Sequence, residues 1–330
     1  MTRVFIIGLP RSGTTWVAKT FDSHPEVLYR HEPDSVIANP QLPQFPAPGE
    51  VERFRDEARV YVDRLFDVAT VKTSGARPWF EKAYRSRGAE MLRGTLCAGL
   101  RAAEAVPRLQ RFARRCPVPD FLGQREASAI VPVVKSVIAA GRADLYAAAC
   151  PEVRFLFVLR HPCGFVASQL RGKELGLMTS KMPVKTMART PQAAARGLTE
   201  DAFRKMTPEQ VIAWYWVIAN ERMFAETNDR PNVLGFSYDG ACQDPLAHFS
   251  RAFAHAGLPL GDETRRFLTD VVEKAPDRRE RYFSLLRNPA ESSTKWREEL
   301  TPAQIDAVLE VAGTSEVFQT HFDGAPAATA

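Results

Sequence analysis

The sequence has few cysteines and no long hydrophobic run. Its five cysteines are odd in number and widely scattered, and none lies in a C-x-x-C or Cys/His ligand spacing. This pattern argues against a disulfide framework or a zinc module and favours reduced thiols in a cytoplasmic protein. No stretch approaches the roughly 18 apolar residues of a membrane span. The apolar run that ends at Gly8 is also too short for the core of a secretory signal peptide.

A large excess of one charge is also absent. The 330 residues carry 44 Lys+Arg and 39 Asp+Glu, a net charge of +5. This excess fits an anionic small molecule as well as a polyanion, and it is too small to indicate nucleic acid as a partner. With 45% hydrophobic and 25% charged residues, the composition excludes disorder, collagen and coiled coil. Oligomeric state is not readable from such data.

Short apolar runs alternate with helical patterns along the chain. Buried strands are predicted at residues 4–7, 130–134, 155–159 and 233–236, with the first in the centre of the sheet. A helix is predicted from Thr14 to just before His24, and further helices at residues 208–227, 245–256, 262–274 and 302–312. Strands separated by helical crossovers predict an α/β fold with a parallel sheet.

Three segments do not fit this scaffold. Residues 39–50 are rich in proline and predict irregular structure. Residues 171–208 are polar and basic with weak periodicity, which is typical of a lid or ligand-binding loop and equally of a solvated connector. Residues 106–125 carry five arginines whose role the sequence does not specify.

The residues from Gly8 to Thr15, GLPRSGTT, follow a predicted strand and open a predicted helix. Their glycine spacing matches the nucleotide P-loop, except that Thr14 stands where the lysine belongs. Backbone N–H groups and the helix dipole still predict phosphate binding. The missing lysine argues against hydrolysis of ATP or GTP. Arg11 offers a cation beside the phosphate, unless it pairs with an acid of the protein itself.

A second anion site is predicted where residues 155–159 end in Arg160. This arginine follows a strand, where open α/β sheets bind ligands, and Ser168 lies on the helix that begins at Pro162. A guanidinium and a hydroxyl converging on one phosphate form a charge-assisted pair of contacts. The sequence therefore predicts a nucleotide with phosphates at two places.

The motifs PRSGTTW at residues 10–16 and LRHPCGFVASQL at residues 159–170 together resemble the PAPS-dependent sulfotransferases, nearest the tyrosylprotein-type and bacterial enzymes. The resemblance implies a single α/β domain over residues 1–323, with a P-loop-like central parallel sheet flanked by helices, and a disordered tail at 324–330. It implies PAPS (3′-phosphoadenosine 5′-phosphosulfate) as cosubstrate, adenosine 3′,5′-bisphosphate as product, and no metal. The nucleotide contacts that it implies are Pro10, Arg11, Ser12, Gly13, Thr14, Thr15, Trp16, Arg160, Ser168, Tyr238 and Lys295.

The resemblance also implies catalytic roles. Lys135, which ends a strand, would act with Arg11 on the leaving group, and Ser293 would donate to the leaving phosphate. The histidine base of the cytosolic enzymes is absent, because Val137 occupies its position. Glu32 falls at the place of the glutamate base in the tyrosylprotein-type enzymes, and His31 is the alternative.

The acceptor is the least determined part of this prediction. Insertions at about residues 36–125 and 171–208 are expected to shape its site. They match no motif, so a small-molecule, lipid or carbohydrate acceptor is possible. Two other functions stay open from the residues alone: a nucleotide kinase or NTPase with a divergent loop, and a non-catalytic nucleotide-binding protein.

Overall fold

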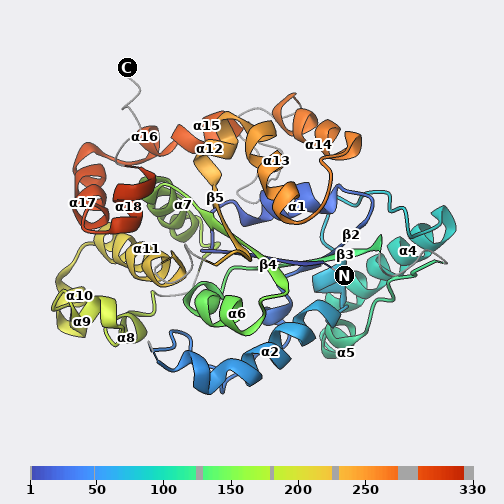
Figure 1. Ribbon diagram of the computed structural model, residues 1–330, viewed down its shortest axis with the longest axis horizontal. Helices are drawn as coiled ribbons and strands as arrows, with labels where there is room; N and C mark the ends of the chain where they lie inside the picture. Colours follow the sequence, from blue (N-terminus) through green and yellow to red (C-terminus); the bar gives the residue numbers. More distant parts are fainter. Residues whose placement is uncertain are drawn as a thin grey trace.

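A computed structural model of the chain describes residues 2–47, 49–123, 129–178, 182–224, 230–273 and 289–322. Its centre is a five-stranded sheet in the order β2-β3-β1-β4-β5, in which every pairing is parallel (Figure 1). The strands are β1 (Arg3–Gly8), β2 (Val27–His31), β3 (Val131–Ser136), β4 (Val153–Leu159) and β5 (Val233–Ser237). The predicted α/β fold is confirmed, with the first strand in the middle of the sheet.

Helices cover both faces of the sheet, so side chains of β1 are buried on either side. Phe5 and Ile7 join one core with α2 (Val51–Asp67), α6 (Ala143–Ala149), α7 (Pro162–Glu174), α11 (Pro208–Phe224) and α17 (Pro302–Ala312). Val4 and Ile6 join the other core with α1 (Thr14–Asp22), α12 (Tyr238–Gln243), α13 (Pro245–His255) and α14 (Asp262–Glu273). In Figure 1, α1, α13 and α14 lie above the sheet, and α2 and α6 lie below it. This double burial explains why the strand is apolar from Val4 to Ile7.

Among the five strands of the sheet, β2 is the one that sequence patterns did not predict. Its sequence, VLYRH, ends in polar residues and lacks the uniformly apolar character of β1 and β4. The structure keeps Arg30 in this strand because its buried guanidinium pairs with Asp120 at 2.5 Å and donates to Ser74 Oγ at 3.2 Å. Partners this far along the chain cannot be read from local periodicity.

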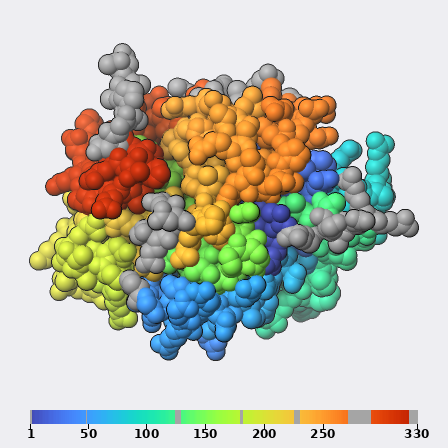
Figure 2. All heavy atoms as spheres, viewed as in Figure 1, coloured from blue at the N-terminus to red at the C-terminus, as the bar shows by residue number. Residues whose placement is uncertain are grey.

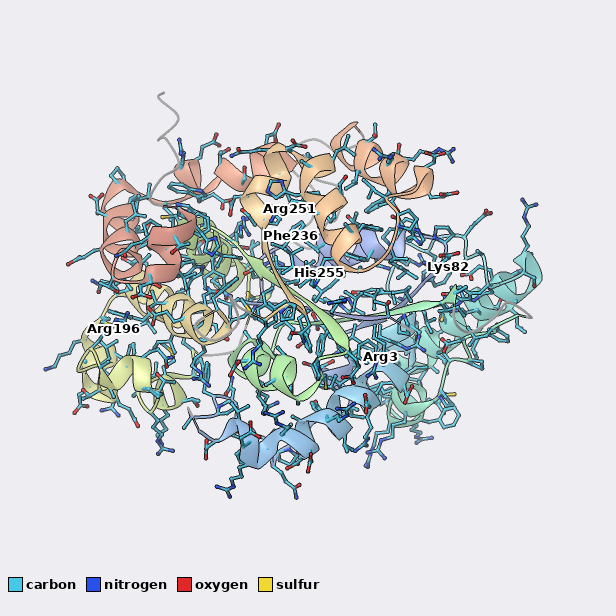
Figure 3. The ribbon with its side chains drawn as sticks, viewed as in Figure 1. Arg3, Lys82, Arg196, Phe236, Arg251 and His255 are labelled. Atoms are coloured by element: carbon cyan, nitrogen blue, oxygen red, sulfur yellow. The ribbon has the colours of Figure 1, made fainter. Side chains whose placement is uncertain are left out.

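The segment before β3 has two parts. Residues 39–47 form no helix or strand, as the prolines predict, and α2 then packs against α6 in the main core. Arg3 at the start of β1 donates to Asp63 of α2 at 2.6 Å and to Glu152 at 3.1 Å (Figure 3). A separate small core holds α3 (Val71–Ser74), α4 (Arg87–Glu104) and α5 (Gln110–Arg115) together; it consists of Val71, Cys97, Leu100, Ala113 and Val118.

The segment after α7 contains three short helices rather than an irregular loop. They are α8 (Val184–Met187), α9 (Pro191–Ala194) and α10 (Glu200–Lys205), and Thr190 and Thr199 cap the last two through their side-chain oxygens. In Figure 2 this yellow segment lies beside the red C-terminal helices. The red helices beside it are α17 and α18 (Glu316–His321), whereas α15 (Pro289–Thr294) and α16 (Trp296–Glu299) precede them in the chain, with α15 beside α12 and α13 (Figure 1).

The remaining sequence expectations concern cysteines and membrane helices. All five cysteines are free thiols, and four of them are buried. In the parts of the chain that the structure describes, no helix has the length and apolar character to cross a membrane.

Candidate active site

Polar residues that follow the five strands gather at one edge of the sheet. All strands are parallel, so their carboxyl ends meet there. The phosphate loop follows β1, Glu32 follows β2, Arg160 follows β4 and Tyr238 follows β5, while Lys135 is the second-last residue of β3. Residues far apart in sequence are thereby brought together by the register of the sheet.

The phosphate loop ends at Gly13, the residue that precedes α1. Gly13 has φ +83°, and a Cβ atom there would lie 2.1 Å from the Tyr238 ring. Only glycine satisfies both the left-handed backbone and this close approach. Helix α1 begins at Thr14, so the N–H groups of its first turn point out of the helix into the loop, where they can bind an anion.

The two predicted anion sites are in direct contact. Arg160 Nη1 donates to the carbonyl oxygen of Arg11 at 2.7 Å, and Arg11 Nε donates to Ser168 Oγ at 3.0 Å. The Arg160 guanidinium also lies over the Tyr238 ring, 4.9 Å from its centroid. The arginine and serine of the second site therefore adjoin the loop.

Two buried donors at this edge have no hydrogen-bond partner in the parts of the chain that the structure describes. They are Arg160 Nε and Trp16 Nε1. Buried N–H groups are nearly always satisfied in folded proteins, so an unpaired one needs an explanation such as a ligand. The explanation fits here because both residues line the same pocket.

This pocket has a volume of about 590 Å³ and collects most of the predicted site residues. Its lining includes Pro10, Arg11, Gly13, Thr14, Thr15, Trp16, Glu32, Lys135, Arg160, Ser168, Tyr238 and Lys295. Ser12 and Ser293 are buried and lie outside the lining. Within the loop, the backbone N–H of Ser12 donates to the Leu9 carbonyl oxygen. Next to Ser293, Ser292 lines the pocket, and its carbonyl accepts from Arg160 Nη2 at 3.1 Å.

Glu32 and Lys135 form an ion pair at the pocket wall. Lys135 Nζ lies 2.5 Å from Glu32 Oε1; the lysine side chain is 2% exposed and the glutamate side chain 23% exposed. The N–H of Glu32 donates to the Lys135 carbonyl at 2.8 Å, which extends the pairing of β2 with β3 by one residue. His31 lies on the other side of Glu32. Its Nε2 is 3.8 Å from Glu32 Oε1, and its Nδ1 is 2.8 Å from the Tyr29 hydroxyl oxygen.

Burial and this ion pair set the protonation of the cluster. Burial lowers the pKa of Lys135, and the Glu32 carboxylate opposes that shift. Burial favours the protonated form of Glu32, yet the Lys135 ammonium holds its pKa below the usual range. Burial, assisted by the Lys135 charge, lowers the pKa of His31 to about 4, so this imidazole is neutral at pH 7.

A second carboxyl group lies behind this cluster. Asp34 is in the 3-10 turn Pro33–Ser35, and it accepts a hydrogen bond from the Ser136 hydroxyl. Its other oxygen is buried and has no partner among the described residues. Burial raises the pKa of Asp34 to about 6, with the Glu32 charge acting in the same direction.

Several pocket residues were not predicted from the sequence. Lys19 is buried on α1, where it pairs with Asp22 at 2.7 Å and donates to the carbonyl of Ala76 at 2.7 Å. That contact holds the segment with Arg77 against the pocket, and no sequence signal pointed to it. Arg171, which pairs with Glu299 at 2.8 Å, follows Ser168 by three positions on α7, so helical spacing could have indicated it.

His161 and two tryptophans of α11 make contacts that are typical of structural residues. His161 Nδ1 accepts from the Cys163 N–H at 3.2 Å, and its ring stacks on Trp296 with centroids 4.8 Å apart. Burial lowers its pKa to about 4. Trp214 and Trp216 lie on α11 and are buried in the core, so they belong to the scaffold.

A phosphate-type loop, facing arginines and a buried lysine at the carboxyl edge of a parallel sheet define a P-loop-like α/β protein with an anion-binding site. The chain belongs to the sulfotransferase family, whose model matches residues 3–262. The protein is therefore a sulfotransferase enzyme, as the sequence motifs predict. No curated protein gives a significant match to the sequence.

Solved sulfotransferase structures resemble the chain at low identity. The sulfotransferase domain of the Synechococcus PCC 7002 olefin synthase is 13% identical, with a TM-score of 0.44 and coverage of 95% of this chain and 94% of that chain. Sulfotransferase STF9 from Mycobacterium avium is 15% identical, with a TM-score of 0.44 and coverage of 96% and 76%. Mouse sulfotransferase SULT7A1, solved in complex with PAP, is 10% identical, with a TM-score of 0.44 and coverage of 98% and 89%.

Proposed function

We propose that this sulfotransferase takes its sulfuryl group from PAPS and transfers it to a hydroxyl or amine of a small-molecule, lipid or carbohydrate acceptor. The observation that carries the proposal is Arg160, whose buried Nε has no partner among the described residues and whose Nη1 contacts the phosphate loop. A donor with phosphates at two places matches two adjoining anion sites better than ATP does.

The residues of the pocket fit this donor. Arg160 and Ser168 would bind its 3′-phosphate, and the loop with the first turn of α1 would bind its 5′-phosphosulfate. Tyr238 and the unpaired Trp16 Nε1 would contact the adenosine, and Lys295 would add charge from the C-terminal segment. When bound, the donor supplies the sulfuryl group and a phosphate leaving group.

Arg11 and Lys135 would stabilise the negative charge that develops on the leaving phosphate during in-line transfer. Glu32 would accept the proton of the attacking hydroxyl as the new S–O bond forms and the S–O bond to phosphate breaks. The products are the sulfate ester, adenosine 3′,5′-bisphosphate and a Glu32 carboxyl group that carries the proton, so the reaction balances.

The Glu32–Lys135 pair gives this base a means of activation. Burial is the largest influence on the pKa of Glu32 and raises it, while the Lys135 contact lowers it. If the ammonium is drawn to a phosphate oxygen, burial dominates and the carboxylate becomes a stronger base.

The test is calorimetric titration with adenosine 3′,5′-bisphosphate, 5′-AMP, and ATP with Mg²⁺. We expect the bisphosphate to bind most tightly and Arg160→Ala to reduce its advantage over 5′-AMP. Arg154→Ala is the matched control, because Arg154 lies on β4 and donates to the Pro231 carbonyl, outside the pocket. Tighter binding of ATP with Mg²⁺ would overturn the choice of donor.

A further inference from the structure

A second pocket, of about 740 Å³, lies outside the nucleotide-sized pocket. It is formed by the end of α7, by α8 and α10, and by the first turn of α11. Its lining is Lys173, Met178, Met182, Val184, Lys185, Glu200, Phe203, Arg204, Pro208 and Val211. The volume lies within the range of pockets that enclose drug-sized organic ligands.

The two pockets adjoin at Met178, which lines both. From there the inner wall of the second pocket is apolar, with Met182, Val184 and the buried Phe203. Methionine side chains are unbranched and polarizable, so such a wall adapts to flexible chains. An apolar path therefore leads away from the pocket that contains Glu32 and Lys135.

The connection between α7 and α8 adds apolar surface at this junction. Leu175 is 52% exposed and Leu177 is 48% exposed, and Leu177 lines the first pocket. Large exposed side chains next to an apolar pocket are typical of a binding surface.

The positive charge that this pocket offers to a ligand comes from its two lysines. Arg204 lies 3.5 Å from Glu200 and also pairs with Asp201, so its charge is largely compensated. Lys173 and Lys185 are exposed, and neither forms an ion pair within the described ranges. An anionic group on a ligand would pair with them, while the rest of that ligand contacts methionine, valine and phenylalanine.

We propose that the acceptor is a long-chain alcohol with an anionic group at its far end, of the ω-hydroxy fatty acid kind. Its hydroxyl would lie at Glu32, its chain would pass Met178 into the second pocket, and its anionic group would pair with Lys173 and Lys185. The inference rests on the proposed function and names its substrate class. The hydroxyl oxygen forms the S–O bond and gives its proton to Glu32, and adenosine 3′,5′-bisphosphate leaves.

The experiment uses the full chain saturated with adenosine 3′,5′-bisphosphate and titrated with 8-hydroxyoctanoate, 10-hydroxydecanoate and 12-hydroxydodecanoate. We expect affinity to rise about threefold per added methylene. Val211→Trp should fill the second pocket and remove this chain-length dependence without changing nucleotide binding. Val184→Trp is a second filling variant should the first not fold, as judged by circular dichroism.

A second experiment tests whether the anionic group of the acceptor pairs with Lys173 and Lys185. The double variant Lys173→Gln/Lys185→Gln should bind 12-hydroxydodecanoate about threefold to fivefold more weakly and leave 1-dodecanol unchanged. Lys205→Gln is the matched control, because this exposed lysine of α10 does not line the pocket. With PAPS present, the double variant should raise KM for the hydroxy acid and leave kcat unchanged, and Lys205→Gln should change neither.

Each outcome is decisive. If the bisphosphate binds but affinity does not rise with chain length, or Val211→Trp leaves the rise intact, the acceptor proposal is overturned and the proposed function stands. Without binding of the bisphosphate, the proposed function fails and the acceptor role fails with it.

Discussion

Arg11 and Glu32 share an unusual backbone conformation. Their φ angles are 75° and 48°, and Phe121 is the third non-glycine residue with positive φ in the described ranges. A left-handed backbone costs a non-glycine residue about 1–2 kcal/mol, and such strain concentrates at functional sites. At both positions it directs a charged residue to the pocket wall.

Glu32→Gln tests the choice of base. The amide cannot accept the proton, so we expect kcat to fall by about 10²–10⁴-fold while binding of adenosine 3′,5′-bisphosphate is kept. His31→Asn should change kcat much less, because the carboxylate remains. Steady-state kinetics with PAPS, together with calorimetry, measure both. A larger loss in the His31 variant would transfer the role of base to the imidazole.

Asp34→Asn tests the pH dependence of stability. Because burial raises the pKa of Asp34 from 3.8 to about 6, the folded state binds more protons than the unfolded state between these pH values. The contribution of Asp34 to the free energy of unfolding therefore declines as pH rises through this window. Asparagine does not titrate, so it removes this decline. Relative to the wild type, the free energy of unfolding of the variant should therefore rise by about 2–3 kcal/mol between pH 4 and pH 7.

Urea unfolding at pH 4 and pH 7 measures this difference. Asp201→Asn is the control, because that aspartate is exposed on α10. An equal effect of Asp34→Asn on the free energy of unfolding at both pH values would contradict the raised pKa of Asp34.

Among the secondary-structure elements, the loop from β1 to α1 depends most on a single residue. Gly13 has positive φ, and the Tyr238 ring occupies the space of a Cβ atom. The ring belongs to α12, which follows β5, so the packing of α12 fixes the shape of the loop. The loop is therefore positioned by tertiary contacts as well as by its own glycines.

Gly13→Ala should lower stability by about 2–5 kcal/mol through backbone strain and overpacking, and should abolish binding of adenosine 3′,5′-bisphosphate. The matched substitution is Gly99→Ala on α4, where an added Cβ meets no atom within 4 Å. Alanine is the better helix former there, so this variant should be about 0.5–1 kcal/mol more stable. Thermal unfolding and calorimetry test the pair; normal nucleotide binding in Gly13→Ala would refute the role of the loop.

For the molecule as a whole, the pocket joins distant parts of the chain. Its walls come from the loop after β1, from α7 on one face of the sheet, from α12 and from α15–α16 near the C-terminal end. A ligand there contacts both cores at once. Its binding free energy is therefore expected to stabilise most the segments that form these walls.

Hydrogen exchange with and without adenosine 3′,5′-bisphosphate measures this coupling. At 100 times Kd the ligand should add about 2.7 kcal/mol to the free energy of unfolding. Protection should increase most in residues 8–15 and 289–299. Helix α4 is the internal control, since it packs in a separate small core. Equal changes in α4 and in the loop would argue against a localised site.

Local patterns in the sequence were sufficient for the scaffold. Short apolar runs predicted β1, β3, β4 and β5. In residues 4–7 and 155–159, burial on both faces of the sheet excludes polar side chains. The strand β2 was not predicted, since Arg30 is buried in it only through Asp120 and Ser74. The short helices after α7 likewise depend on caps and packing that weak periodicity does not show.

The sequence alone determined the family and the two anion-binding motifs, because a phosphate loop and a strand-end arginine are local arrangements of backbone and charge. The folded chain decided which residues share a pocket: it paired Lys135 with Glu32, brought Arg160 to Arg11, and turned Ser292 rather than Ser293 toward the site. These contacts join residues more than 100 positions apart. Strand order and helix packing create them, and no local pattern encodes such distances.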